Sequence, residues 1–352
     1  MSGLLNILTE SVNEVPRIEF PNLFDKSIIV NRVAFNLFGV DIYWYGVIIA
    51  VGVILAFIYA MHKCKQFGLI PDHVFDVAFV AIIFGFIGAR AYYCIFIDTD
   101  INFFDLRHGG LAIYGGIIAA AIAAAITCVI HKVNLPAMFD VGGLGLLIGQ
   151  CIGRWGNFVN QEAYGAPTAG SLPWGMTGTT IINDPVVIAK QAELDAAGNG
   201  LFALVHPCFL YESLWCLIGF LILHFYHKHR KFDGEIFALY IFLYGLERSV
   251  VEGLRTDSLY IGSVRASQML AAISAAAALV YIIVMRVRLK KAPVPLYRDT
   301  EESKRLIAES EKAEQAEEDC RKAKKEQKNQ LTDDQKIVSD EPEDGSEENG
   351  EK

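Results

Sequence analysis

Long apolar segments separated by short polar ones fill most of the chain. A helix needs roughly 20 mainly apolar residues to cross the hydrocarbon core of a bilayer. Segments of suitable length predict transmembrane helices at residues 43–61, 74–97, 111–130, 138–153, 209–226, 235–253 and 267–285. The polar residues 131–136 keep the third and fourth of these helices separate. The predicted fold class is therefore an all-α polytopic membrane protein with about seven transmembrane helices.

Two flanking regions and one long loop lie outside the predicted helices. Residues 1–41 lack the basic region and cleavage site of a signal peptide and are expected to form an external N-terminal arm. Residues 166–205 form the longest loop of the transmembrane domain, which spans residues 42–291. Residues 292–352 form a charged tail that is expected to be largely disordered, although residues 301–330 have the composition of a helix.

Charge is unevenly distributed along the chain. From residue 301 onward there are 18 acidic and 10 basic residues, a net charge of −8 out of −9 for the whole chain. The remainder has no basic face of the kind that binds nucleic acid. Lysine and arginine concentrate in the loops after the first, third, fifth and seventh helices, at positions 63, 65, 132, 228, 230, 231, 286, 288, 290 and 291. Because positive loops face the cytoplasm, we expect the N-terminus outside and the tail in the cytosol.

A polar cluster follows the fourth predicted helix, within residues 153–165. It contains Arg154, Asn157, Asn160 and Glu162. A charged side chain costs about 3 kcal/mol or more near the bilayer centre, so such a cluster indicates a functional site. The alternative is an arginine that extends to the interface among glycines that only pack helices. The polar side chains beside Arg154 favour the functional interpretation.

The sixth predicted helix carries a second set of polar residues. Tyr244, Arg248, Glu252 and Arg255 are spaced by four, four and three residues, which places them on one helical face. Arg248 with Glu252, and Glu252 with Arg255, have the spacing of helical ion pairs, so a purely structural ladder is the alternative. Glu247 lies on another face, and no role is assigned to it.

The rise per residue of a helix predicts that these groups lie at the same depth in the membrane. At 1.5 Å per residue, Arg154 lies about 24 Å and Arg248 about 21 Å from the cytosolic boundary. Tyr45 and Tyr114 lie close to the external ends of their helices. The polar groups are therefore expected to converge near the outer surface of the membrane.

The three arginines outnumber the acids expected to face them. Arg154, Arg248 and Arg255 meet only Glu162 and Glu252 in this arrangement. The surplus of positive charge indicates an anionic ligand. A phosphodiester fits best because the planar guanidinium group binds two phosphate oxygens at once.

Five blocks of the sequence resemble the motifs of the prolipoprotein diacylglyceryl transferases, a family of bacterial membrane enzymes. They are residues 43–46 (YWYG), 109–116 (GGLAIYGG), 153–165 (GRWGNFVNQEAYG), 206–212 (HPCFLYE) and 244–257, with YGLER and EGLRTD. Their order is that of the family. The resemblance implies a multi-pass protein of the bacterial plasma membrane, without a cofactor, whose active site faces the outer leaflet. It also implies that the long loop forms a small outer domain.

The resemblance further implies the reaction and the roles of single residues. The family transfers the diacylglyceryl group of phosphatidylglycerol to the lipobox cysteine thiol of a preprolipoprotein, the first step of lipoprotein maturation. The products are a thioether and glycerol-1-phosphate. By this resemblance Arg154 binds phosphatidylglycerol and Arg248 is essential. The remaining positions that the family uses around the headgroup are Tyr45, Asn157, Glu162, Tyr244, Glu252 and Arg255.

The attacking thiol must lose a proton, and several groups are candidates to accept it. His206, His108, Glu252 and a phosphate oxygen are possible acceptors. Tyr114 falls where some family members have histidine and many others tyrosine. An ordinary tyrosine is a poor base at neutral pH, so positioning or proton relay is favoured for Tyr114.

A transporter and a protease are alternatives to the transferase. A phospholipid transporter or scramblase with the same arginine cluster usually shows inverted repeats or broken helices at the midplane, and this sequence shows neither. An intramembrane protease is disfavoured because the sequence has no GxSxG serine, HExxH pair or suitable pair of aspartates. The seven cysteines have no metal-binding spacing.

Overall fold

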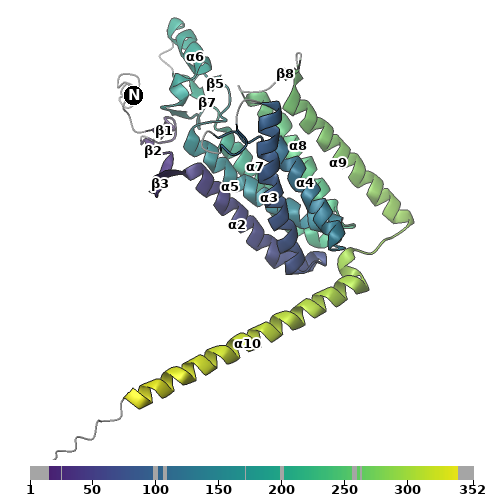
Figure 1. The fold of residues 1–352 in the computed structure, drawn as a ribbon. Coiled ribbons are helices and arrows are strands. Elements are labelled where there is room, and N and C mark those ends of the chain that lie inside the picture. The colour runs from purple at the N-terminus through teal and green to yellow at the C-terminus, as the bar shows by residue number, and fades with distance from the viewer. Residues whose placement is uncertain are drawn as a thin grey trace, which may run out of the picture. The chain divides into compact units, whose positions relative to one another are not determined.

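The computed structural model describes residues 16–24, 26–97, 102–105, 109–170, 172–198, 202–255, 260–261 and 264–339. The chain divides into two compact units between Thr300 and Glu301, and each unit is described by itself. The first is a helical bundle with short strands at one end, and the second contains one long helix (Figure 1).

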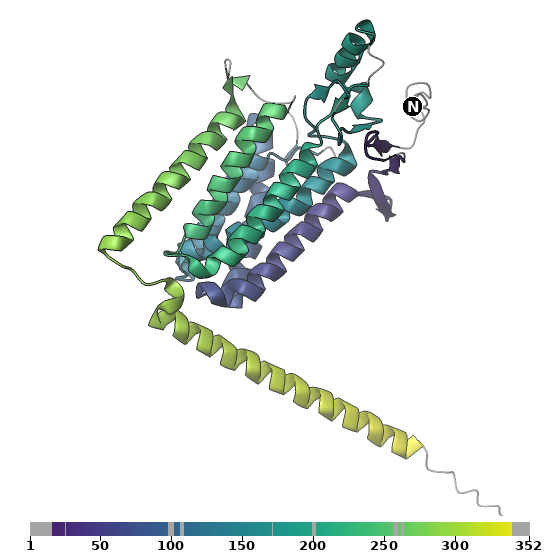
Figure 2. The ribbon, with the colours of Figure 1, turned by 180° about the vertical axis from the view of Figure 1, so that it is seen from behind.

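Seven long helices run side by side in the first unit, as both views show (Figure 1, Figure 2). They are α2 (Trp44–Lys63), α3 (Pro71–Phe96), α4 (Ile113–Ile130), α5 (Leu135–Asn160), α7 (Cys208–Tyr226), α8 (Glu235–Leu254) and α9 (Ala266–Lys291). Each predicted apolar segment corresponds to one of these helices. Short 3-10 helices accompany them: η1 (Cys64–Phe67), η2 (Ile181–Asn183), η3 (His227–His229) and η4 (Tyr297–Asp299).

Six helices among the described residues are long and apolar enough to cross a membrane. Helix α8 is not among them because it carries Glu235, Glu247, Arg248 and Glu252. The prediction of a mainly helical, multi-pass membrane protein is therefore confirmed.

Helix α5 lies at the centre of the bundle and packs against α2, α7 and α8. Helices α3 and α4 form a close pair, in which a Cβ at Gly88 would lie 2.2 Å from the Cβ of Ala119. Helix α9 packs on α8, where a Cβ at Gly245 would lie 2.6 Å from the carbonyl oxygen of Ala271. Small residues let membrane helices approach this closely and gain van der Waals contact.

Short strands gather at the end of the bundle where α5 ends (Figure 1). Strand β1 (Arg17–Glu19) pairs in antiparallel fashion with β2 (Ile28–Ile29) and with β6 (Thr177–Gly178). Three further antiparallel pairs are β3 (Val33–Leu37) with β4 (Val40–Tyr43), β5 (Pro167–Thr168) with β7 (Leu204–Val205), and β8 (Tyr260–Ile261) with β9 (Val264–Arg265). Helix α6 (Pro185–Ala196) lies in the same region. The β1–β6 pairing joins the N-terminal arm to the loop after α5.

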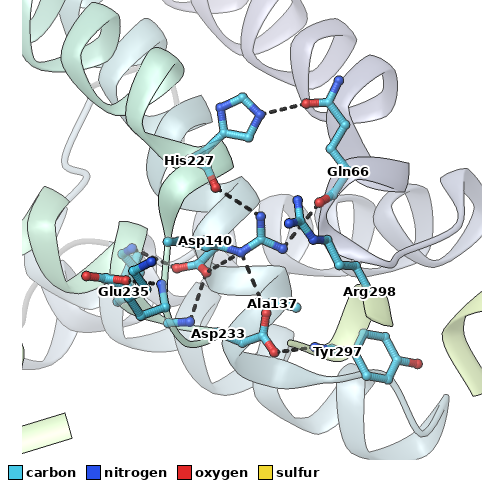
Figure 3. Close-up of polar contacts among 12 residues, drawn as sticks. Gln66, Ala137, Asp140, His227, Asp233, Glu235, Tyr297 and Arg298 are labelled. Atoms are coloured by element: carbon cyan, nitrogen blue, oxygen red, sulfur yellow. Dashed lines mark hydrogen bonds and ion pairs between the residues drawn. The ribbon is translucent and has the colours of Figure 1, made fainter. Parts of the chain in front are cut away.

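A buried ion cluster lies at the opposite end of the bundle (Figure 3). The Nε atom of Arg230 is 4.0 Å from Oδ2 of Asp140 on α5 and 3.7 Å from Oδ1 of Asp233. We call these three residues the Arg230 cluster. The Asp140 carboxylate also accepts hydrogen bonds of 2.9 Å from the N–H groups of Gly234 and Phe237. It therefore binds the N-terminus of α8, where negative charge is stabilising.

The Arg230 cluster joins segments that are far apart in the sequence. Arg230 donates hydrogen bonds to the carbonyl oxygens of His227 and Gln66 (Figure 3). Asp233 accepts one of 2.7 Å from the N–H group of Tyr297, which follows α9. Burial raises the pKa of Asp233 and lowers the pKa of Arg230. The cluster thus connects η1, η3 and η4 to the central helix.

The second unit contains helix α10 (Glu301–Ser339). The helix suggested by the composition of residues 301–330 is present, and it continues beyond them to Ser339. Most of its described side chains are exposed. Surface ion pairs line it, such as Lys322 with Glu318 at 2.9 Å and a spacing of four residues. Such pairs stabilise an exposed helix only slightly.

Candidate active site

Three arginines meet around one carboxylate at the end of the bundle that carries the strands. Arg154 on α5 forms an ion pair with Glu212 on α7. The Nη1 atom of Arg248 on α8 is 4.0 Å from Oε1 of Glu212, and Nη1 of Arg255 is 3.9 Å from the same oxygen. We call these four residues the arginine site. Arg154 and Arg248, from separate helices, thus both reach Glu212.

The members of the arginine site differ in exposure. The side chain of Glu212 is 1% exposed, whereas those of Arg154, Arg248 and Arg255 are 21%, 18% and 12% exposed. The carboxylate is therefore sealed, while each arginine side chain stays partly accessible. Guanidinium groups bind the oxygens of anionic ligands through paired N–H donors.

The end of α8 differs from its predicted course. Arg248 and Glu252 form the expected helical pair, with Nη2 of Arg248 at 2.6 Å from Oε2 of Glu252. The helix ends at Leu254, and Arg255 has an extended backbone with φ −78° and ψ 148°. The prediction that Arg255 continues the helical face is therefore wrong. Its guanidinium group instead reaches across to Glu212.

One of the two acids predicted to face the arginines is also wrong. The structure brings Glu212 into the middle of the three arginines, and Glu252 is buried beside Arg248. Glu247 is also buried and lies within electrostatic range of Glu212 and of all three arginines. Its Oε1 atom has no hydrogen-bond partner among the described residues. Glu162, which the prediction placed opposite the arginines, is exposed. The three arginines thus pair with two buried acids, Glu212 and Glu252, and Glu247 lies nearby without an ion pair among the described residues.

The sequence indicates that Glu212 needs a cationic partner, although the prediction did not count it among the acids that face the arginines. It is a carboxylate within an apolar segment, six residues after the start of the block HPCFLYE at His206. An acidic side chain in such a segment needs a partner because burying it alone costs several kcal/mol, on the order of 3. Which cation supplies that partner depends on how α7 packs against α5 and α8.

A tyrosine and a polar loop lie beside Arg154. Tyr45, in the first turn of α2, lies close enough to Arg154 and Glu162 for their charges to act on its hydroxyl group. A Cβ at Gly156 would lie 2.6 Å from the Tyr45 ring, so only glycine lets this ring approach α5. Glu162 accepts a 3.0 Å hydrogen bond from the Nδ2 atom of Asn157. These residues therefore form one side of the arginine site.

Tyr244 lies on the other side of the site. It precedes Arg248 by one helical turn on α8 and is within electrostatic range of Arg154 and Glu212. The predicted headgroup residues thus come from α2, α5, α8 and the loop after α5, which are brought together only in the folded bundle.

Of the candidate proton acceptors, Glu252 pairs with Arg248, whereas the side chain of His206 contacts Tyr211. The Nδ1 atom of His206 is 3.2 Å from the hydroxyl of Tyr211, which accepts a 2.6 Å hydrogen bond from Trp174. Burial lowers the pKa of His206, so its ring is neutral at neutral pH. Tyr114 begins α4 and is exposed. Among the described residues, no hydrogen bond or ion pair joins His206 or Tyr114 to the arginine site, and His108 lies outside the described residues.

Arg90 on α3 is a buried arginine that the sequence analysis did not single out. Its five N–H groups all donate to backbone carbonyl oxygens, at 2.6–2.9 Å, of Asn102, Phe103, Asp105, Gly109 and Gly110. Gly110 has φ +87°, and a Cβ there would lie 2.7 Å from Nη1 of Arg90. Arg90 therefore holds the loop that leads into α4 and Tyr114.

The described residues offer no metal centre. In that part of the chain, no group of three or more His, Cys, Asp or Glu side chains is arranged to hold a metal ion. None of the seven cysteines forms a disulfide among the described residues, and four of them are buried.

An apolar helical bundle in which three arginines surround one buried carboxylate at one end defines a polytopic membrane protein. The chain belongs to the prolipoprotein diacylglyceryl transferase family, whose profile matches residues 32–284. This match confirms the resemblance carried by the five sequence blocks. The tail after α9 lies outside it.

Individual relatives agree with the family match, and each is named phosphatidylglycerol–prolipoprotein diacylglyceryl transferase. The Finegoldia magna protein is 40% identical over 269 residues, 74% of this chain and 97% of the relative. The Clostridioides difficile protein is 40% identical over 249 residues, 69% and 91% of the two chains. The Enterococcus faecalis protein is 37% identical over 265 residues, 73% and 91% of the two chains.

Proposed function

We propose that this protein transfers the diacylglyceryl group of phosphatidylglycerol to the lipobox cysteine of a preprolipoprotein, the first step of bacterial lipoprotein maturation. Its family membership and the names of its relatives support this activity. The observation that carries the mechanism is the meeting of Arg154, Arg248 and Arg255 around Glu212. This arrangement supplies a partly open cationic surface for a phosphodiester.

The reaction displaces a phosphate oxygen from a glycerol carbon. The cysteine sulfur forms a bond to the terminal carbon of the diacylglyceryl group, and the bond from that carbon to the phosphate oxygen breaks. The electron pair of the broken bond stays on the oxygen, so glycerol-1-phosphate leaves with an added negative charge. The thiol proton passes to an acceptor, which makes the sulfur nucleophilic.

The arginines stabilise the charge that develops on the leaving group. Guanidinium groups fixed by Glu212 and Glu252 need little reorganisation when that charge appears, and such fixed donors act strongly in a site of low dielectric. Arg154 and Arg248 bind the phosphate in this proposal, and Arg248 has the larger catalytic role. Arg255 and the side chains of Tyr45, Asn157, Glu162, Tyr244 and Glu252 position the headgroup.

The transfer of the thiol proton has two candidate routes in this proposal. His206 has a neutral ring at neutral pH and is held by Tyr211, so it is suited to accept a proton. Tyr114 acts by positioning or relay. A phosphate oxygen that faces the arginines is the other acceptor. Substitution of His206 distinguishes these routes, because only the first loses its acceptor.

We also propose the arrangement of the protein in the membrane. Helix α8 adds a seventh span to the six apolar helices, since it packs along α5 and α9, and its acids Glu235 and Glu252 have arginine partners. The N-terminal arm and the small domain of residues 166–205 lie outside, and residues 292–352 lie in the cytosol. The loops rich in lysine and arginine support this orientation. The arginine site then faces the outer leaflet.

A transfer assay tests the proposed function. The purified protein is reconstituted with phosphatidylglycerol labelled in its acyl chains and with a peptide that contains a lipobox cysteine. We expect covalent label on the peptide, and none on a peptide in which serine replaces the cysteine. Movement of labelled lipid between leaflets without a covalent product would instead support a transporter or scramblase, an alternative that the comparisons do not support.

A further inference from the structure

Glu212 occupies the point where the three arginines converge. Oε2 contacts Arg154, while Oε1 lies 4.0 Å from Arg248 and 3.9 Å from Arg255. The last two distances exceed the length of a hydrogen bond, so Glu212 acts on these arginines through its charge. A phosphate bound by the same arginines lies close to this carboxylate. The inference below rests on the proposed function.

Substrate and product of the proposed reaction differ in charge. The phosphodiester of phosphatidylglycerol carries one negative charge. Glycerol-1-phosphate is a monoester and carries about −1.5 to −2 at pH 7. Three arginines without an acid between them would bind the more highly charged product more tightly. A site of that kind would be inhibited by its own product.

We propose that Glu212 makes the arginine site selective for a monoanionic phosphodiester over a dianionic phosphomonoester. Its carboxylate offsets one of the three positive charges, and Glu252 offsets a second through its 2.6 Å pair with Arg248. The second charge of the product then meets Glu212 at a place where the carboxylate is 1% exposed and water screens little. The resulting repulsion favours release of the product.

This arrangement has a cost in the chemical step. The charge that Glu212 repels in the product begins to form in the transition state, so the carboxylate reduces part of the stabilisation that the arginines supply. Glu212 is accordingly a specificity-determining residue that exchanges some transition-state stabilisation for faster product release.

A comparison of two soluble ligands tests the proposal. The probes are glycerol-1-phosphate and glycerophosphoglycerol, the deacylated monoanionic headgroup, and calorimetry measures their binding to the purified full-length protein. We expect the wild-type protein to bind the diester at least as tightly as the monoester. In Glu212→Gln we expect binding of the monoester to tighten about tenfold, and binding of the diester by less than about threefold.

Matched variants separate charge from shape. Glu212→Asp keeps the charge and should keep the wild-type ratio of the two affinities. Glu193→Gln removes an exposed acid that pairs with Lys190 on α6, and it should also leave the ratio unchanged. In the transfer assay, added glycerol-1-phosphate should inhibit Glu212→Gln more strongly than the wild type.

Two results would overturn the proposal. One is a wild-type protein that binds the monoester more tightly than the diester, which decides the matter even if Glu212→Gln does not fold. The other is an equal change for both ligands in a folded Glu212→Gln. Because binding is measured directly, loss of transfer in the wild type would count against the proposed function and leave the selectivity test intact.

Discussion

Helix α5 carries an arginine–carboxylate cluster at each of its ends, and the two clusters differ in what they leave accessible. Asp140, in the Arg230 cluster, and Arg154, in the arginine site, are separated by about 21 Å along the helix. The side chain of Arg230 is fully buried, with Nη1 and Nη2 donating to backbone carbonyl oxygens and Nε facing Asp140 and Asp233. The three arginines of the other cluster each keep part of the side chain exposed.

We propose that this difference separates a structural arginine from one that binds a ligand. Both clusters contain buried acids, so the presence of ion pairs does not distinguish them. In the Arg230 cluster the acids also bind backbone N–H groups, of Gly234, Phe237 and Tyr297, and thereby join segments of the chain. In the arginine site the acids pair with arginine side chains that stay partly exposed. We propose that this exposure, together with the convergence of three cations on one carboxylate, marks the site that binds the ligand.

Removal of an arginine from the arginine site should have the largest effect on activity. Arg154→Ala and Arg248→Ala are each expected to lower transfer by about 10²- to 10³-fold, because a fixed donor to the leaving phosphate is lost. Initial rates of label transfer measure this effect, with Lys231→Ala as an exposed control that keeps its activity. Equal activity of all three variants would contradict the proposed site.

Removal of Arg230 should act on stability instead. Arg230→Ala leaves Asp140 and Asp233 buried without their cation, which is expected to cost about 3–5 kcal/mol. The thermal midpoint in detergent should fall well below that of Arg154→Ala. The folded fraction of Arg230→Ala should retain most of its transfer rate. A lower transfer rate of Arg230→Ala with an unchanged thermal midpoint would contradict the distinction between the two clusters.

Arg90 is a second fully buried arginine, and its substitution gives a further test of the structural role. Arg90→Lys replaces five directed donors by three, so at least two carbonyl oxygens of the α3–α4 loop lose a charged partner. The expected loss of stability is about 2 kcal/mol, seen as a lower thermal midpoint. The effect on transfer should be smaller than that of Arg154→Ala. A reduction as large as that of Arg154→Ala would place Arg90 in the reaction itself.

Deletion of residues 301–352 should have the smallest effect. The helix α10 belongs to the second compact unit and lies beyond the part of the chain that matches the family. We expect unchanged transfer per molecule in purified membranes. Loss of most activity would show that the tail contributes to catalysis.

The apolar segments and the composition of the sequence are sufficient to predict much of the helical architecture. The seven long helices α2–α5 and α7–α9 match seven apolar segments, because segment length and hydropathy are local properties that the bilayer selects for. The pair of Arg248 and Glu252 followed from a spacing of four residues. Arg154 was also identified, because a cation at the end of an apolar segment stands out against its surroundings.

The partners across helices were decided only by the tertiary structure. Glu212 lies on a different helix from each arginine that it orients, and Arg230 meets Asp140 and Gln66 from distant parts of the chain. The sequence shows that such buried charges need partners, because an unpaired charge is costly in a medium of low dielectric. It does not show which partners they find, because that depends on which faces of α5, α7 and α8 turn toward one another.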